Sequence, residues 1–235
     1  GATGGLGSQL CKTLADKGCD IILHYNSNKP KAEEIKTEIE SMGVKTTLIQ
    51  VDFSSKTAVD DLVSAITEPI DYFVHTSAIT GNLLRASEVT LQEMEMVNYV
   101  NFLVPAELTK KLHSMVKETV LFVGSVAEDA MFSGSSTYVT SKRKLHSFAV
   151  TYAATARKNK VRAIYYMIGL LDKGMVEKLN PKQQIQAMES IGQKTLLNTH
   201  DVAERIAMSL YVPKVLGVKH SREGELVVRR DGFSV

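Results

Sequence analysis

A tyrosine and a lysine stand four residues apart in the segment Tyr138-Val-Thr-Ser-Lys142, at the start of a predicted helix. Residues at this spacing lie on one face of a helix, so the phenol and the ammonium are expected to be neighbours. An ordinary tyrosine has a pKa of about 10, too high for efficient proton transfer at neutral pH. A lysine beside it stabilises the phenolate and brings the tyrosine pKa toward the working range. The pair predicts a general acid and base, although one such spacing among 8 tyrosines means little alone.

Two polar residues precede this pair and give it context. Ser125 stands 13 residues before Tyr138 at the end of a predicted strand, and Asn98 stands 27 residues before Ser125 inside a predicted helix. Each has a simpler explanation in isolation, since Asn98 could be a packing amide and Ser125 a cap at the strand end. Taken together, they make a candidate catalytic set of Asn98, Ser125, Tyr138 and Lys142.

Glycines cluster at the beginning of the chain, in Gly1-Ala-Thr-Gly-Gly-Leu-Gly7, directly before a predicted helix. Gly1 permits a sharp turn, Gly5 lets the backbone approach a diphosphate, and Gly7 allows close packing of the helix against a strand. The helix N-terminus adds unpaired N–H groups and a positive dipole end. We interpret the turn as a dinucleotide site, although glycine clusters also form ordinary turns.

No acid follows the second strand of the expected fold, where an enzyme that prefers NAD commonly carries a carboxylate for the ribose hydroxyls. That strand ends Tyr25-Asn26-Ser27. The missing carboxylate removes a repulsion against a 2′-phosphate, and Asn26 or Ser27 could donate to that group. NADP(H) is therefore favoured over NAD(H), although no arginine supports it and the segment could be a plain polar turn.

Apolar strands alternate with helices along the chain. The pattern predicts strands at residues 20–25, 44–51, 71–76, 119–124, 161–167 and 226–229, and helices at 8–17, 31–41, 56–66, 91–116 and 136–158. Nearly continuous apolar strands between helices indicate a doubly wound, Rossmann-like α/β fold, with a parallel sheet covered on both faces. This architecture needs a strand just before the glycine turn, so we expect the first strand to be missing from this sequence.

One domain is expected over residues 1–235, because neither a linker nor a repeat interrupts the pattern. The pattern loosens over residues 170–199, which contain Gly174, Pro181 and several lysines and glutamines. This segment is either a substrate-shaping insertion or a plain pair of surface helices.

Composition excludes several classes of protein. The formal net charge is +2 with basic and acidic residues interleaved, so neither a nucleic acid nor an anionic membrane is expected as a partner. No apolar run reaches the roughly 20 residues that span a bilayer, and no signal peptide is evident, so we expect a cytoplasmic protein. Cys11 and Cys19 are expected to be small buried residues, and we expect no metal site.

The glycine turn, Asn98, Ser125 and Tyr138-x-x-x-Lys142, in this order and spacing, resemble the short-chain dehydrogenase/reductase superfamily in its single-domain form. The resemblance runs from Gly1 to about Gly232. It implies hydride transfer between a nicotinamide cofactor and a carbonyl/alcohol pair. It also implies that Tyr138 is the general acid/base and that Lys142 binds the nicotinamide ribose and lowers the tyrosine pKa. Ser125 would bond the substrate oxygen, and Asn98 would hold a water in a proton relay.

The same resemblance implies the cofactor contacts, including an adenine contact at Asp52, which would otherwise be the cap of the next helix. The expected cofactor-binding residues are Gly1, Thr3, Gly4, Gly5, Leu6, Gly7, Tyr25, Asn26, Ser27, Asp52, Phe53, Ser77, Ala78, Tyr138, Lys142 and Gly169.

Two segments depart from the family pattern. His75-Thr-Ser-Ala78 stands where the family has Asn-Asn-Ala-Gly, and Ile168-Gly169 stands where it has Pro-Gly. These changes affect the backbone on the nicotinamide side and motivate an alternative, a cofactor-binding regulatory or scaffold protein with little turnover.

The segment from His24 to Glu34 is similar to bacterial 3-oxoacyl-[acyl-carrier-protein] reductases, so a 3-oxoacyl thioester is the expected substrate. An acidic carrier could dock on residues 157–160 or 143–144, unless these are solvated helix faces. A homo-oligomer, tetramer or dimer, is also expected from the resemblance. Its interface could be the helix face with Leu145, Phe148, Ala149 and Tyr152, unless these residues face the sheet.

Overall fold

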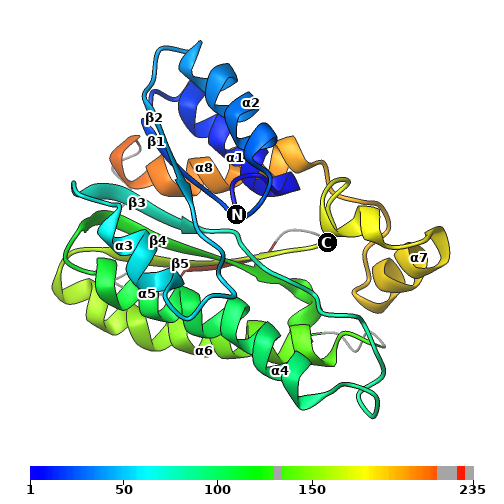
Figure 1. Ribbon diagram of the computed structural model, residues 1–235. Helices are drawn as coiled ribbons and strands as arrows, with labels where there is room; N and C mark the ends of the chain where they lie inside the picture. The colour runs from blue at the N-terminus through cyan, green and yellow to red at the C-terminus, as the bar shows by residue number, and fades with distance from the viewer. Residues whose placement is uncertain (130–133, 216–226, 231–235) are drawn as a thin grey trace.

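Helices and strands alternate along the chain in the computed structural model, which describes residues 1–129, 134–215 and 227–230 (Figure 1). The strands are β1 (Ile21–Tyr25), β2 (Thr46–Gln50), β3 (Ile70–His75), β4 (Val116–Ser125), β5 (Arg162–Ile168) and β6 (Val227–Arg230). The α-helices are α1 (Gly5–Asp16), α2 (Lys29–Glu40), α3 (Ala58–Ser64), α4 (Leu91–Asn98), α5 (Val104–Leu112), α6 (Ser136–Lys158), α7 (Pro181–Ser190) and α8 (Thr199–Val215). The short elements are a π-helical turn, η1 (Tyr99–Leu103), and the 3-10 helices η2 (Val126–Asp129) and η3 (Met175–Lys178).

All strand pairs among the described residues are parallel. β1 pairs with β2, and β3, β4, β5 and β6 form a second sheet in that order. Parallel neighbours need crossover connections, which the intervening helices supply. The predicted Rossmann-like parallel α/β architecture is confirmed, and the strand expected before Gly1 stays a prediction. The edge strand predicted at residues 226–229 is β6, and Leu226 lies outside the described residues.

Helices cover both faces of the strand layer, with α1, α2 and α8 on one side and α3, α5 and α6 on the other (Figure 1). β4 shows why its sequence is almost wholly apolar. Leu121 and Val123 join the core on the α1 side, whereas Val120 and Phe122 join the core on the α6 side. A strand buried on both faces has no polar face, as parallel sheets require.

The long helical stretch predicted over residues 91–116 is helical from Leu91 to Leu112, with η1 as a π-helical turn between α4 and α5, whereas Val116 already belongs to β4. The N–H of Val104 donates to the carbonyl of Tyr99, five residues back instead of four. Pro105 has no N–H to donate to the carbonyl of Asn101, so a regular α-helical bond cannot form there. The proline therefore explains the π-helical turn, a feature often found at functional sites.

Residues 170–199 leave the sheet after β5 and return to α8. Leu171 and Leu197 form a parallel bridge at the base of this insertion. Next to it, the amide of Gln193 accepts from the N–H of Leu170 at 2.8 Å and donates to its carbonyl at 2.8 Å. α7, the main helix of the insertion, buries only Ala187. It stands apart from the helices that cover the sheet (Figure 1).

The α6 face that was considered for an interface points into the protein. Leu145, Ala149 and Tyr152 are buried in the core with β4 and β5, and Phe148 packs against them. The alternative explanation, that these residues face the sheet, is therefore confirmed for the three buried ones.

Cys11 and Cys19 are both free thiols. Within the described part of the chain, no helix is long and apolar enough to cross a membrane.

Candidate active site

The glycine-rich turn leads into α1, whose N-cap is Gly4 and has no side-chain cap. The first N–H groups of a helix have no partner within the helix, so α1 presents free donors and a positive dipole end here. A Cβ atom on Gly7 would lie 2.2 Å from the carbonyl oxygen of Gly1, so no larger residue fits. Thr3 is half-buried beside this turn, whereas Leu6 points into the core. The turn therefore fits a dinucleotide diphosphate, although Leu6 offers it only backbone.

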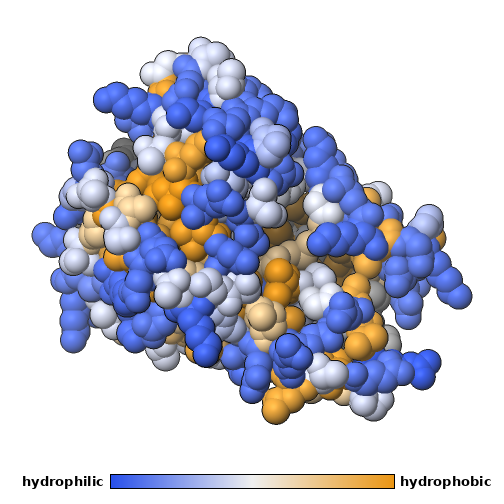
Figure 2. All heavy atoms as spheres, in the orientation of Figure 1, coloured by the Kyte–Doolittle hydropathy of each residue, from blue (hydrophilic) through white to orange (hydrophobic). Residues whose placement is uncertain are grey.

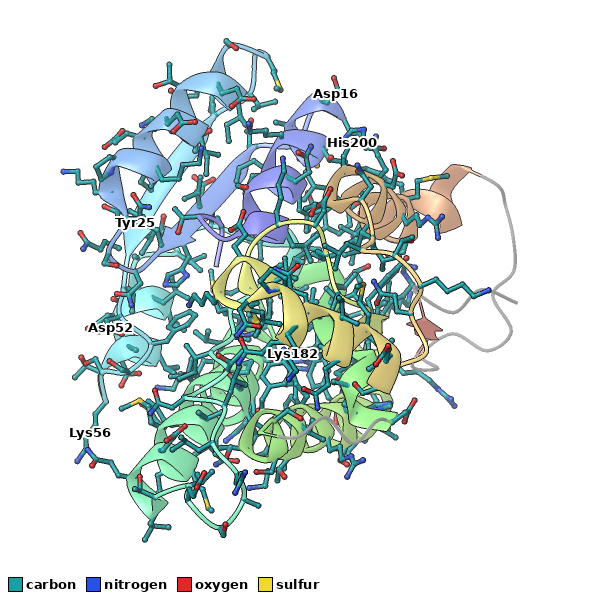
Figure 3. All side chains as sticks on the ribbon, turned by 90° about the vertical axis from the view of Figure 1, so that its right-hand side faces the viewer. Asp16, Tyr25, Asp52, Lys56, Lys182 and His200 are labelled. Atoms are coloured by element: carbon teal, nitrogen blue, oxygen red, sulfur yellow. The ribbon has the colours of Figure 1, made fainter. Side chains whose placement is uncertain are left out.

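Two loops that were predicted to contact the cofactor meet at the ends of β1 and β2 (Figure 3). Asn26 and Ser27 are exposed directly after β1, and Asp52 is exposed directly after β2. The Asn26 side-chain amide donates to the Asp52 carboxylate at 3.4 Å, and the N–H of Ser54 donates to the same oxygen at 2.9 Å. These exposed polar groups fit the ribose and adenine end of a dinucleotide.

Two other predicted cofactor residues are buried instead. Tyr25 lies in the core, and its hydroxyl donates to Gln50 at 3.3 Å. Phe53 is also buried and stacks on His24, with ring centroids 4.1 Å apart. Both side chains support the loop ends rather than present polar groups to a ligand.

The segment after β3 lies directly beneath the glycine turn. A Cβ atom on Gly1 would be 2.7 Å from atoms of Thr76 and Ser77, so the two backbones are in close contact. Ala78 is half-buried next to them. The altered segment His75–Ala78 therefore still allows the close approach that the Asn-Asn-Ala-Gly motif would give.

His75 is buried at the end of β3, and its Nε2 has no hydrogen-bond partner. Burial, followed by the nearby positive charge of Lys142, holds the pKa of His75 well below its ordinary value. The ring is therefore neutral at physiological pH.

Ser125, Tyr138 and Lys142 converge where β4 ends and α6 begins. Lys142 Nζ lies 5.8 Å from the centre of the Tyr138 ring. Tyr138 is within hydrogen-bonding reach of Ser125, whose hydroxyl also accepts from the N–H of Ala127 at 3.2 Å. The three side chains predicted from the motif thus form one cluster.

The electrostatics of this cluster differ from the prediction that Lys142 lowers the pKa of Tyr138. Burial raises the pKa of Tyr138 to about 12, while the hydrogen bond with Ser125 opposes the rise. Burial also lowers the pKa of Lys142 to about 8. Its ammonium donates to the carbonyl of Val123 at 2.8 Å rather than to the phenol. The phenolate of Tyr138 therefore receives little stabilisation from Lys142. In this arrangement Tyr138 is a protonated phenol at neutral pH, and a weaker acid than an ordinary tyrosine.

Asn98 does not join the cluster by any hydrogen bond among the described residues. It is half-buried at the end of α4, and its side-chain oxygen accepts from Lys144 at 2.8 Å. Asn101, three residues later in η1, is fully buried. Its amide binds the N–H and carbonyl of Ile79 at 2.9 and 2.8 Å and donates to Ser141 at 3.0 Å.

Asn101 therefore connects the loop after β3 with α6. Its partner on α6, Ser141, directly precedes Lys142. Asn101 was not predicted from the sequence, because the motif spacing selects Asn98. A signal was available, since Pro105 four residues later releases the carbonyl of Asn101 from the helix ladder.

Gly169 ends β5 on the same side of the sheet. A Cβ atom there would lie 2.3 Å from the side-chain oxygen of Gln193, so a larger residue would displace the Gln193 amide from its bonds with Leu170. A Cβ atom on Gly5 would likewise meet the backbone of Lys173 and Gly174 at 2.9 Å. The glycine turn and the start of the insertion are thus in contact. Figure 3 shows α7, marked by Lys182, in front of the carboxyl ends of the strands, where ligands of open α/β sheets bind.

Comparison with known proteins identifies the family. Residues 1–184 match the family model described as short chain dehydrogenase. The chain belongs to the short-chain dehydrogenase family.

Curated relatives agree with this assignment. The chain is 28% identical to the uncharacterized oxidoreductase YmfI of Bacillus subtilis over 217 residues, covering 89% of this chain and 88% of that protein. It is 22% identical to the 3-oxoacyl-[acyl-carrier-protein] reductase FabG of Staphylococcus epidermidis, covering 88% of this chain and 87% of that protein.

Solved structures share the fold. The angucycline C-6 ketoreductase LanV with bound NADP superposes with a TM-score of 0.84 at 16% identity, covering 99% of this chain and 92% of that one. A short chain dehydrogenase from Burkholderia cenocepacia in complex with NADP gives a TM-score of 0.83 at 21% identity, covering 99% of this chain and 94% of that one.

The described residues contain no cluster of three or more His, Cys, Asp or Glu side chains that could hold a metal ion.

Proposed function

We propose that this short-chain dehydrogenase is an NADP(H)-preferring reductase of carbonyl compounds. The substrate class that we propose is the 3-oxoacyl thioesters. The observation that carries the proposal is the convergence of half-buried Tyr138 with Ser125 and the buried Lys142 at the carboxyl end of β4. NADPH, when bound, supplies the hydride that reaches the carbonyl carbon.

The chain's own groups handle the proton. Tyr138 donates its proton to the carbonyl oxygen as that oxygen gains negative charge, and Ser125 donates a hydrogen bond to the same oxygen. Lys142, already buried beside the phenol, holds the nicotinamide ribose and provides positive charge. Asn101 replaces Asn98 as the asparagine of this site. Its role is to fix the loop after β3 against α6. The carbonyl compound leaves as an alcohol.

The cofactor preference rests on the loop after β1. Asn26 and Ser27 offer donors to a 2′-phosphate and no acid occupies the two positions after Tyr25, although the Asp52 carboxylate lies 3.4 Å from the Asn26 amide. The NADP-bound relatives support the same preference.

The substrate class rests on the FabG relatives and on the insertion over residues 170–199, which we propose shapes the substrate site. Figure 2 shows a hollow with apolar residues on its floor between the main body and the α7 segment. Of the two candidate docking sites for an acidic carrier, Arg143 and Lys144 lie within two turns of Tyr138 on α6 and are exposed, although both also bind atoms of their own chain. Arg157, Lys158 and Lys160 are exposed at the other end of α6, about 28 Å along the helix from Tyr138, and are less suitable.

A homo-oligomer, dimer or tetramer, is also proposed. Large apolar side chains are exposed on α4, at the end of η1 and on α6, and their burial between copies would remove them from water. These residues are Leu91, Met94, Met96, Leu103 and Val150. Light scattering after size-exclusion chromatography measures the molar mass of the assembly. A monomer at all concentrations would contradict this part of the proposal. The cytoplasmic location stays a prediction.

The test begins with nucleotide binding to the full-length protein. Fluorescence titration should show tight binding of NADPH and weaker binding of NADH. Oxidation of NADPH is then followed with 3-oxoacyl thioesters, with Tyr138→Phe as the control that removes the proton donor alone. Binding without turnover of any carbonyl substrate would instead favour a regulatory or scaffold protein, and the absence of binding would refute the reductase.

A further inference from the structure

A buried carboxylate lies directly behind the proposed active site and takes no part in the mechanism above. Glu128 sits in η2, the turn that follows β4 three residues after Ser125, and only 3% of it is exposed. Burying an ionised carboxylate is costly unless donors surround it. The contacts of Glu128 therefore indicate what the residue does.

Donors reach the carboxylate from three elements. The N–H of Ser125 donates to its Oε1 at 3.1 Å, and the hydroxyl of Tyr165 on β5 donates to the same oxygen. His146 Nδ1 on α6 contacts Oε2 at 3.1 Å. Because the first two groups are donors and His146 can be a third, the arrangement suits the ionised form.

The rest of the cluster locks these elements together. Arg143 on α6 donates through its guanidinium to the main-chain carbonyl of Glu128. The ring of His146 stacks on Tyr165, with centroids 4.3 Å apart and planes 7° from parallel. Gly124 makes room for this packing, since a Cβ atom there would lie 2.3 Å from the Tyr165 ring. Glu128 thus links β4, β5 and α6 through side-chain hydrogen bonds, in addition to the ladder that pairs β4 with β5.

The same carboxylate acts on the reactive groups. The Tyr165 hydroxyl that binds Glu128 lies 3.0 Å from the main-chain oxygen of Lys142, so the cluster reaches the backbone of the catalytic helix. The negative charge of Glu128 raises the pKa of Tyr138 and also that of Lys142. This charge therefore opposes deprotonation of both groups, although burial is the larger cause of each pKa shift.

We propose that Glu128 is a positioning residue of this active site, which fixes the turn after Ser125 and holds a negative charge beside Tyr138 and Lys142. The proposal rests on the proposed function for its kinetic readout only. The titratable and charged groups around this region are Tyr138, Lys142, Arg143 and His146 from α6, Tyr165 from β5 and His75 from β3. Asp129 in the same turn is exposed.

Two substitutions separate the charge from the geometry. Glu128→Gln keeps a side chain of the same length that still accepts from Ser125 and Tyr165, but it removes the charge. Glu128→Asp keeps the charge, but the shorter side chain cannot reach all its donors. Asp129→Asn is the matched control, because it removes an equal formal charge from an exposed neighbour.

The charge is measured without turnover. The absorbance titration of Tyr138 is isolated by subtracting the titration of a Tyr138→Phe variant made in the same background. We expect the apparent pKa of Tyr138 to fall by about one unit in Glu128→Gln, as expected for loss of a nearby like charge, and to stay unchanged in Asp129→Asn. An unchanged pKa in Glu128→Gln, or an equal fall in Asp129→Asn, would overturn the electrostatic role.

The geometry is measured by turnover. We expect kcat for carbonyl reduction to fall about tenfold in Glu128→Asp with an unchanged alkaline limb of the pH profile, since small misplacements of reacting groups are costly. In Glu128→Gln the alkaline limb should move to lower pH. An active wild type with an unaffected Glu128→Asp variant would overturn the positioning role, whereas an inactive wild type would overturn the proposed function instead. Glu128→Asp decides the positioning role on its own, whether or not Glu128→Gln folds.

Discussion

Replacing Asn101 with alanine tests the assignment of this buried amide most directly. Its oxygen accepts from the N–H of Ile79, and its nitrogen donates to the carbonyl of Ile79 and to Ser141. Asn101→Ala removes all three bonds in one change. Ser141 keeps a partner, because its hydroxyl also donates to the carbonyl of Tyr138 at 2.7 Å. The two main-chain groups of Ile79 lose their protein partner.

The magnitude follows from those two groups. Leaving a buried polar group unsatisfied costs about 1–3 kcal/mol. Ile79 is 37% exposed, so water can reach part of its backbone and reduce that penalty. We therefore expect a loss of about 2–3 kcal/mol in the free energy of unfolding. The loop after β3 would also no longer be held in place against α6. Because small misplacements of reacting groups are costly, kcat should fall by about tenfold or more.

Urea denaturation and steady-state reduction of a 3-oxoacyl thioester measure the two effects on one preparation. Asn98→Ala is the matched control, since it deletes the same side chain three residues away. Asn98 is half-buried and binds only Lys144 among the described residues, so its loss should change stability by less than about 0.5 kcal/mol. The reasoning is refuted if Asn101→Ala unfolds like the wild type, or if Asn98→Ala loses more activity than Asn101→Ala.

Three further predictions follow from the site. Tyr138→Phe should lower kcat by roughly 10²–10⁴-fold while NADPH affinity, measured by fluorescence, changes little; a variant with normal kcat would remove Tyr138 from the mechanism. Lys142→Met should raise the free energy of unfolding at pH 7 by about 1–3 kcal/mol and abolish turnover. The folded pKa of Lys142, about 8, lies below the ordinary value of 10.5, so between these values the unfolded chain holds a proton that the folded chain lacks. The destabilisation by Lys142 is complete below about pH 8 and fades as the pH rises toward 10.5, so denaturation curves of the two proteins should converge there. Gly7→Ala should weaken NADPH binding at least about tenfold, because its Cβ would collide with the carbonyl of Gly1; Gly43→Ala, strained by a φ of +92° but with open space around it, should cost about 1 kcal/mol of stability and leave NADPH binding intact.

Much of the fold could be predicted because each element carries its own periodicity. α6 begins and ends at the predicted residues, Ser136 and Lys158, since a long helix with a buried stripe is the clearest pattern in the chain. The π-helical turn between α4 and α5 could not be predicted from the pattern of polar and apolar residues, because no residue pattern marks such a turn. Only Pro105 indicated it.

The site was predicted unevenly for a related reason. Tyr138, Lys142 and Ser125 follow from local spacing, and the structure brings them together. Tyr25 was assigned to the cofactor although strand alternation already indicated burial, since Ile21, Leu23 and Tyr25 share one face of β1. Glu128 had no sequence signal, because its partners come from β4, β5 and α6, and only the tertiary packing puts them side by side.

The closure of the insertion by Gln193 has a consequence for how specificity can change. Its amide satisfies both main-chain groups of Leu170, and the bridge between Leu171 and Leu197 lies beside it, so the base of the insertion is held without help from α7. Replacing the segment from Met175 to Ser190 should therefore leave the base of the insertion closed. Under the function proposed above, such an exchange would change which substrate is accepted without altering Tyr138 or Ser125.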